Sequence, residues 1–423
     1  MTDTEKEPGR GDSGSVRGSG TGETTANRRV ENRLFTADFI YATLANFANA
    51  FGMQMLVATL PVYVINLGGS QADAGLVTGA LALTALLFRP VVGWLTDTWR
   101  RRPLVLIGTS CYGLASVFYL LAGSIPFLVV GRIVNGFGLC CYTTAANAYV
   151  ADIAPLTRRA EAMGFFAAAQ AVGLIIGPVV GFLLVGTTGF RHLFYFAGGL
   201  AFIAFFISLF AKEHRQPWEI KRRPWSPRTG IVAVDALPVA WMALCMGLAF
   251  GALSAFISIF ALPRGLPNPG VFFMVQAVAL LISRTFAGRL ADRRGRASAI
   301  VPGTIVMAAG LVLLPFVQGL PWFVISASLF GLGFGTAQPA TMALLIDRVR
   351  PEQRGLATGT YFTGFDAGIS IGAIGLGMVG QHWGFGVMWP LAAACTLLGL
   401  AGLLADRHPG RSPKKTAKPS QSS

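Results

Sequence analysis

The sequence predicts an all-α membrane protein with twelve transmembrane helices, built as two copies of one six-helix unit. Its composition is 53% hydrophobic and only 13% charged over 423 residues, whereas soluble domains have about 25% charged residues. The mean hydropathy is +0.58. Twelve long apolar segments and an internal repeat support the same prediction.

The repeat is visible in two stretches that share one spacing of arginine, glycine and aspartate. Arg89, Gly93 and Asp97 recur 195 residues later as Arg284, Gly288 and Asp292. The same offset relates further pairs: Gly136 and Gly331, Asp152 and Asp347, Arg159 and Arg354, Gly177 and Gly372. Because the offset holds without slippage across about half of the chain, it indicates a duplication.

A helix needs about 20 mostly apolar residues to cross the hydrocarbon core of a bilayer. In the first half, such segments lie at about 36–63, 73–96, 103–123, 126–150, 161–185 and 191–211. In the second half, they lie at about 236–262, 270–290, 298–318, 321–346, 355–380 and 384–405. We therefore expect one six-helix bundle over 35–211 and a second over 236–405.

Three polar segments complete the predicted organisation. Residues 1–34 are rich in Gly, Ser, Thr and charges of both signs, which predicts a disordered cytoplasmic tail. Residues 212–235 predict a cytoplasmic linker between the repeats, and a short interfacial helix carrying Trp218 and Trp225 is the alternative. Residues 406–423 form a basic cytoplasmic tail.

The distribution of basic residues predicts the orientation in the membrane. Of the 34 Lys and Arg residues, only Arg191 and Arg264 fall in connections on the side opposite the tails. The positive-inside rule then places both termini in the cytoplasm of a protein of the cell membrane. For the same reason the net charge of +15 reports orientation and does not indicate a nucleic-acid partner.

The stretches at 93–102 and 288–296 resemble the loop 2–3 signature of the major facilitator superfamily, and the chain resembles a twelve-helix transporter of that family over 36–405. Thr98 and Arg100 depart from the signature in the first copy. The resemblance implies two pseudo-symmetric halves that rock around a midplane site.

A carboxylate at a helix end can accept charge-assisted hydrogen bonds from arginine and so latch one conformation, while a small residue lets two helices approach. The expected gating residues are Arg89, Gly93, Asp97, Arg101, Arg284, Gly288, Asp292 and Arg296. The alternative for the aspartates as well as the arginines is ordinary anchoring at the cytoplasmic surface.

Two further signatures point to transport chemistry. Residues 131–138 resemble a motif whose arginine, here Arg132, is associated with proton coupling. The alternative is that the Arg132 side chain snorkels to the membrane surface, since the residue lies about 9 Å inside the helix end.

Glycines in the fifth helix resemble a motif that accompanies antiport, although Phe182 departs from it. The expected hinge residues are Gly164, Gly173, Gly177, Pro178 and Gly181, with generic small-residue packing as the alternative.

Asp366 is the acid deepest in the predicted bilayer, and burial favours the neutral form of a carboxyl group, which suits cyclic protonation. A hydrogen-bonded packing role is the alternative for Asp366. Asp38 is a substitute candidate for the proton site. Polar residues expected in a substrate cavity are Asn46, Asn49, Gln54, Asn135, Gln170, Gln276 and Gln338.

The sequence therefore predicts a secondary transporter, most simply a proton-coupled exporter of a small amphiphilic drug or metabolite. A proton-coupled uptake symporter is the main alternative, and a receptor or channel is a remote one. No HExxH motif and no GxxxxGK[ST] phosphate-binding loop is present, so an enzyme is not expected. The expected partners are a small-molecule substrate, protons and the lipid bilayer, for a monomer without cofactor or metal.

Overall fold

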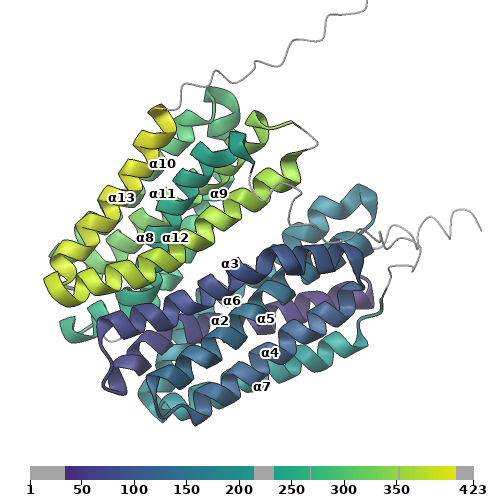
Figure 1. Cartoon of the computed structure of the whole chain (residues 1–423), viewed down its shortest axis with the longest axis horizontal. Helices are drawn as coiled ribbons and strands as arrows, with labels where there is room; N and C mark the ends of the chain where they lie inside the picture. Colours follow the sequence, from purple (N-terminus) through teal and green to yellow (C-terminus); the bar gives the residue numbers. More distant parts are fainter. Residues whose placement is uncertain (1–33, 214–232, 267, 351–352, 406–423) are drawn as a thin grey trace, which may run out of the picture.

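The computed structural model describes residues 34–213, 233–266, 268–350 and 353–405, without the side chains of Leu156 and Asp292. Within these ranges the chain is almost entirely helical (Figure 1). Residues 1–33 and 406–423 of the predicted tails, and the tryptophans of the predicted linker, lie outside the described residues. The N-terminal half contains α2 (Ala37–Asn66), α3 (Gln71–Thr98), α4 (Arg101–Leu121), α5 (Ile125–Ile153), α6 (Arg159–Thr188) and α7 (Phe190–Phe210). The C-terminal half contains α8 (Leu237–Ala261), α9 (Gly270–Arg294), α10 (Ala297–Leu313), α11 (Leu320–Arg348), α12 (Arg354–Trp383) and α13 (Phe385–Ala405).

The described residues form twelve helical spans that are long and apolar enough to cross a membrane, with α8 and α10 counted together with their flanking 3-10 turns, so the predicted fold class is confirmed. The repeat is preserved in the helix boundaries. Helices α5, α6 and α7 begin at residues 125, 159 and 190, and α11, α12 and α13 begin 195 residues later, at 320, 354 and 385. The turns that join the last two helices of each half also correspond, because both contain a glycine with positive φ: Gly189 at 86° and Gly384 at 76°. Glycine adopts this left-handed conformation without the steric cost that a Cβ would add.

One helix is shorter than predicted. The segment expected at about 298–318 forms α10 only as far as Leu313, and Leu314–Phe316 continue as a short 3-10 helix. Pro315 lies inside that turn. A proline has no N–H to donate, so it cannot extend the α-helical hydrogen-bond ladder, and the chain tightens into a 3-10 turn.

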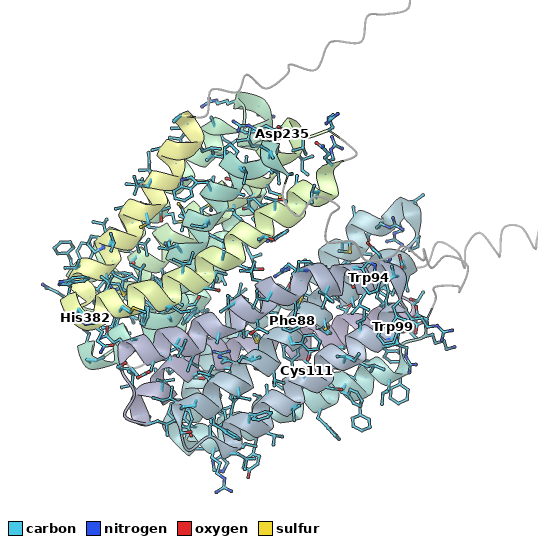
Figure 2. The ribbon with its side chains drawn as sticks, in the orientation of Figure 1. Phe88, Trp94, Trp99, Cys111, Asp235 and His382 are labelled. Atoms are coloured by element: carbon cyan, nitrogen blue, oxygen red, sulfur yellow. The ribbon has the colours of Figure 1, made fainter. Side chains whose placement is uncertain are left out.

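The two bundles meet through pairs of helices that the repeat relates to one another. Helix α3 packs against α12, and their repeat equivalents α9 and α6 also pack together. Figure 1 shows α3 and α12 side by side along the boundary. We call the side where α2 begins and α13 ends the terminal face, and the side where α2 leads into α3 the opposite face. In Figure 2, Asp235, Trp94 and Trp99 mark the terminal face, and His382 marks the opposite face.

The described hydrogen bonds between the bundles lie towards the opposite face. The Ser258 hydroxyl donates to the Ala58 carbonyl at 2.9 Å, and the Asn268 amide donates to the Val179 carbonyl at 3.3 Å. At the outer end, the backbone N–H of Ala72 donates to the Gln381 side chain at 3.3 Å. The halves are therefore joined beyond the middle of the membrane span, on the side away from the chain ends.

Candidate functional site

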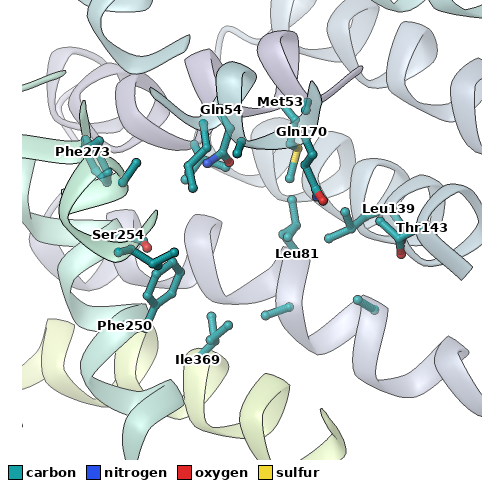
Figure 3. Close-up of a pocket in the computed structure, with 18 of the residues that line it drawn as sticks. Met53, Gln54, Leu81, Leu139, Thr143, Gln170, Phe250, Ser254, Phe273 and Ile369 are labelled. Atoms are coloured by element: carbon teal, nitrogen blue, oxygen red, sulfur yellow. Dashed lines mark hydrogen bonds between the residues drawn. The ribbon is translucent and has the colours of Figure 1, made fainter. Parts of the chain in front are cut away.

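A cavity of about 440 Å³ lies between the two bundles, near the middle of the helices. Figure 3 shows that Gln54 and Gln170 of the N-terminal bundle and Phe250 and Phe273 of the C-terminal bundle line the cavity. Most of the wall is apolar and a few polar groups interrupt it, as is usual for sites that bind small organic molecules.

Six of the seven polar residues expected in a cavity line this one: Asn46, Asn49, Gln54, Gln170, Gln276 and Gln338. Asn135 is the exception. It is 1% exposed and lies behind the wall, in a much smaller space that it shares with Asn49. The aromatic part of the wall was not anticipated, because Phe250, Phe334 and Phe365 resemble ordinary core residues in sequence; only their positions on helices that face the boundary distinguish them.

Asp366 lines the cavity and joins the two bundles through an ion pair. Its Oδ2 lies 2.7 Å from Nη2 of Arg89, and the two side chains are 11% and 30% exposed. Arg89 also packs against the ring of Phe362, 5.9 Å from the ring centroid. The pair links α12 to α3. Among the described ion pairs and hydrogen bonds between the bundles, it lies nearest to the terminal face.

This contact gives Arg89 a partner that the sequence did not predict. Arg89 is expected to act in the gating stretch with Asp97, and its guanidinium pairs with Asp366 of the other half. The sequence carried a signal for this pairing, since an arginine and an aspartate within membrane helices both require a partner. Asp38, the substitute proton candidate, lies outside the cavity; its carboxylate accepts the backbone N–H of Lys212 at 3.0 Å.

Arg132 is a buried cation on the cavity wall. It is 1% exposed, which excludes the snorkelling alternative in this conformation. No carboxylate lies within 4.0 Å of its guanidinium among the described residues, and its Nε and Nη1 have no protein hydrogen-bond partner there. Tyr119 of α4 is a polar neighbour of its guanidinium.

At the terminal face, the repeat preserves an ion pair in each half. Arg101 Nε lies 2.8 Å from Asp152 Oδ2, and Arg296 Nε lies 2.8 Å from Asp347 Oδ2. The four residues are related by the 195-residue offset. Arg101 and Arg296 therefore do more than contribute positive charge, because each joins the third helix of its half to the end of the fourth.

The glycines of the gating stretches do not lie at helix contacts in this conformation. A Cβ added at Gly93 or at Gly288 would meet nothing within 4 Å, so the expected close approach is absent here. Asp97 is in the last turn of α3 and is exposed. The side chain of Asp292 lies outside the described residues.

In the fifth helix of the first half, the predicted glycine motif packs closely on α2. A Cβ on Gly173 would lie 2.8 Å from the nitrogen of Phe51, and one on Gly177 would lie 2.9 Å from Cβ of Gln54. Gly181 faces Met55 and Thr59 of the same helix. Gly164 does not belong to this contact, since nothing lies within 4 Å of its added Cβ. The peptide that follows Pro178 meets Gly270 of the other half.

The second half repeats this packing around Asp366. Gly368 and Gly372 of α12 face the backbone of α8 at the Leu244 and Leu248 carbonyls. They correspond to Gly173 and Gly177 through the repeat offset. Asp366 is therefore held on a helix whose neighbouring turns are fixed against backbone.

The chain is similar to transporters over most of its length. Its sequence matches the Major Facilitator Superfamily over residues 42–283 and 268–423. An MFS-type transporter of Methanocaldococcus jannaschii is 24% identical over 365 residues, which cover 84% of this chain and 94% of that protein. Multidrug resistance protein 2 of Bacillus subtilis is 26% identical over 337 residues, covering 75% and 82%.

The fold agrees with these matches. The crystal structure of the nucleoside transporter NupG superimposes with a TM-score of 0.73 at 15% sequence identity, and the match covers 87% of this chain and 98% of that one. With twelve spanning helices, a duplicated six-helix unit and a family match over most of its length, this chain belongs to the Major Facilitator Superfamily of membrane transporters.

Proposed function

We propose that this transporter is a proton-coupled exporter that exchanges protons for a small amphiphilic compound. The observation that carries the proposal is the ion pair between Asp366 and Arg89, which lies on the cavity wall and joins the two halves. Protonation of Asp366 removes its charge and so weakens a contact that holds α12 to α3. Proton binding and the arrangement of the halves are then linked, because a conformation that keeps the ion pair disfavours the proton.

The conformation described here fits one step of such a cycle. Apart from the Arg89–Asp366 pair, the described hydrogen bonds between the halves lie towards the opposite face. We therefore propose that the cavity opens towards the terminal face, which the positive-inside rule assigns to the cytoplasm. With Asp366 ionised and paired, this is the state of an exporter that has released its proton inwards and is ready to bind substrate from the cytoplasm.

Two observations favour export of an amphiphile. The cavity combines aromatic walls with a few polar groups, which suits a substrate with an apolar body. The close-packed glycines of α6 resemble the motif that accompanies antiport, and one similar protein, Multidrug resistance protein 2, carries a name that refers to drug resistance.

The direction of coupling can be tested without knowing how the protein is oriented in a vesicle. In proteoliposomes with the membrane potential clamped by K⁺ and valinomycin, an antiporter concentrates its substrate on the acidic side, whereas a symporter concentrates it on the alkaline side. We expect dansylglycine or ethidium, an anionic and a cationic amphiphile, to accumulate in an acid-interior lumen above the level in protein-free liposomes. Accumulation in an alkaline lumen would establish the uptake symporter, and transport indifferent to the gradient would refute proton coupling.

The terminal-face carboxylates give a further prediction. We propose that Asp97 stabilises the alternative conformation, in which the terminal face is closed. Asp97→Asn should then slow transport by about tenfold, equivalent to about 1.4 kcal/mol on the rate-limiting step, with normal insertion into the membrane. Glu161→Gln is the control, because it removes an exposed ion pair with Arg158 of a kind worth about 0–1 kcal/mol. Equal transport by the two variants would remove Asp97 from gating.

A further inference from the structure

The two helix pairs that join the halves are equivalent by the repeat but differ in charge. On one side, Arg89 of α3 meets Asp366 of α12. The residues equivalent to this pair by the 195-residue repeat are Arg284 of α9 and Ala171 of α6. These two helices also pack together. The second side therefore keeps the arginine and lacks the carboxylate.

The space beside Arg284 belongs to the cavity. Phe362 and Asp366, which surround the Arg89 guanidinium, correspond to Ala167 and Ala171. Both alanines line the cavity, as does Arg284. Phe362 and Asp366 fill the space beside Arg89, whereas the corresponding residues beside Arg284 are alanines and the space there is part of the cavity.

The guanidinium of Arg284 is held in place by a neutral partner. Its Nη2 donates to Oε1 of Gln338 at 3.2 Å, and Gln338 also lines the cavity. No carboxylate lies within 4.0 Å of Arg284 among the described residues. The remaining N–H groups of a guanidinium can bind a carboxylate through two parallel hydrogen bonds.

The charged groups of the cavity wall leave an excess of positive charge. The charged side chains that line it are Arg132, Arg284 and Asp366, and Arg89 neutralises Asp366. Arg132 and Arg284 then remain as two cations within a largely apolar site. A cation in such surroundings favours a ligand that brings the opposite charge.

We infer that the substrate is an amphiphilic organic anion whose carboxylate, or a similar acidic group, binds Arg284 in the position that Asp366 occupies beside Arg89. Its apolar body packs against the aromatic wall formed by Phe250, Phe273 and Phe334. This inference rests on the proposed transport function, to which it adds the chemical class of the substrate.

Equilibrium binding to the purified full-length protein tests the inference with three probes that share one fluorophore: dansylglycine, dansylglycinamide and dansylethylenediamine, which are an anion, a neutral amide and a cation. We expect the anion to bind at least ~10-fold more tightly than the other two, a ratio typical of one charge-assisted contact. Arg284→Gln should abolish this preference and Arg284→Lys should retain part of it. Arg289→Gln, on the same helix but away from the cavity wall, is the matched control and should leave the preference unchanged.

A second pair of variants supplies the missing carboxylate from the protein itself. Ala171→Asp should compete with the ligand for Arg284 and lower the affinity for dansylglycine more than Ala171→Asn does, because asparagine fills the same space without the charge. Thermal unfolding of each variant checks that it is folded. Absence of dansylglycine binding, equal binding of the three probes, or an anion preference that survives in Arg284→Gln would overturn the inference. Because no pH gradient is used, these outcomes are independent of whether transport is coupled to protons.

Discussion

Asp366→Asn is expected to abolish accumulation of substrate against a gradient while exchange of substrate between the two sides of the membrane continues. Asparagine has nearly the shape of aspartate and can still accept a hydrogen bond from Arg89, but it cannot bind and release a proton. The variant should therefore behave as a transporter fixed in the protonated form. Proteoliposomes under an imposed pH gradient measure accumulation, and counterflow of labelled against unlabelled substrate measures exchange.

The ion pair sets the expected size of the structural effect. Removing one partner of a buried pair costs about 3–5 kcal/mol, and the 30% exposure of the Arg89 side chain places this pair at the lower end. Asp366→Glu keeps the carboxyl group and should retain part of the coupling. Asp38→Asn tests the substitute candidate and should leave accumulation unchanged, since Asp38 lies outside the cavity. If Asp366→Asn accumulates substrate as the wild type does, the proton site lies elsewhere and the packing alternative for Asp366 holds.

The sequence was most informative where one periodicity or one offset recurred many times. The twelve spans follow from apolar runs, and the 195-residue offset also joins features that only the structure reveals, such as the paired Arg101 and Asp152 in one half and Arg296 and Asp347 in the other. The polar cavity residues could be anticipated because an amide side chain within a membrane helix must face protein or water.

Contacts between the halves could not be predicted in this way. Arg89 and Asp366 are 277 positions apart in sequence, and no local sequence pattern predicts that α3 lies against α12.

The spacing of the glycines also did not distinguish those that pack against another helix from those that do not. Gly164 and Gly173 belong to the same motif, yet only Gly173 lies against another helix. Whether a position has no room for a side chain depends on the rotation of its helix and on the conformation of the transporter.

That distinction leads to the prediction with the most severe structural consequence: valine at Gly177 or at its repeat equivalent Gly372 should block transport. The added side chain at Gly177 would meet α2 at Gln54 and Phe51, and at Gly372 it would meet the Leu248 carbonyl of α8. Overpacking costs about 1–3 kcal/mol, and here much of the obstacle is backbone, which cannot move aside by changing a rotamer. The helices must separate, and they carry the cavity wall and Asp366 with them.

The same helices provide matched controls. Gly186 of α6 and Gly375 of α12 have nothing within 4 Å of an added Cβ, so Gly186→Val and Gly375→Val make the same chemical change without the clash. Membrane insertion, thermal unfolding and transport should be measured for all four variants. We expect transport and stability to fall only in the first pair, because a general loss of helix flexibility would affect both pairs alike. Wild-type transport by Gly177→Val and Gly372→Val would show that the close packing of α6 on α2 and of α12 on α8 is not required for the cycle.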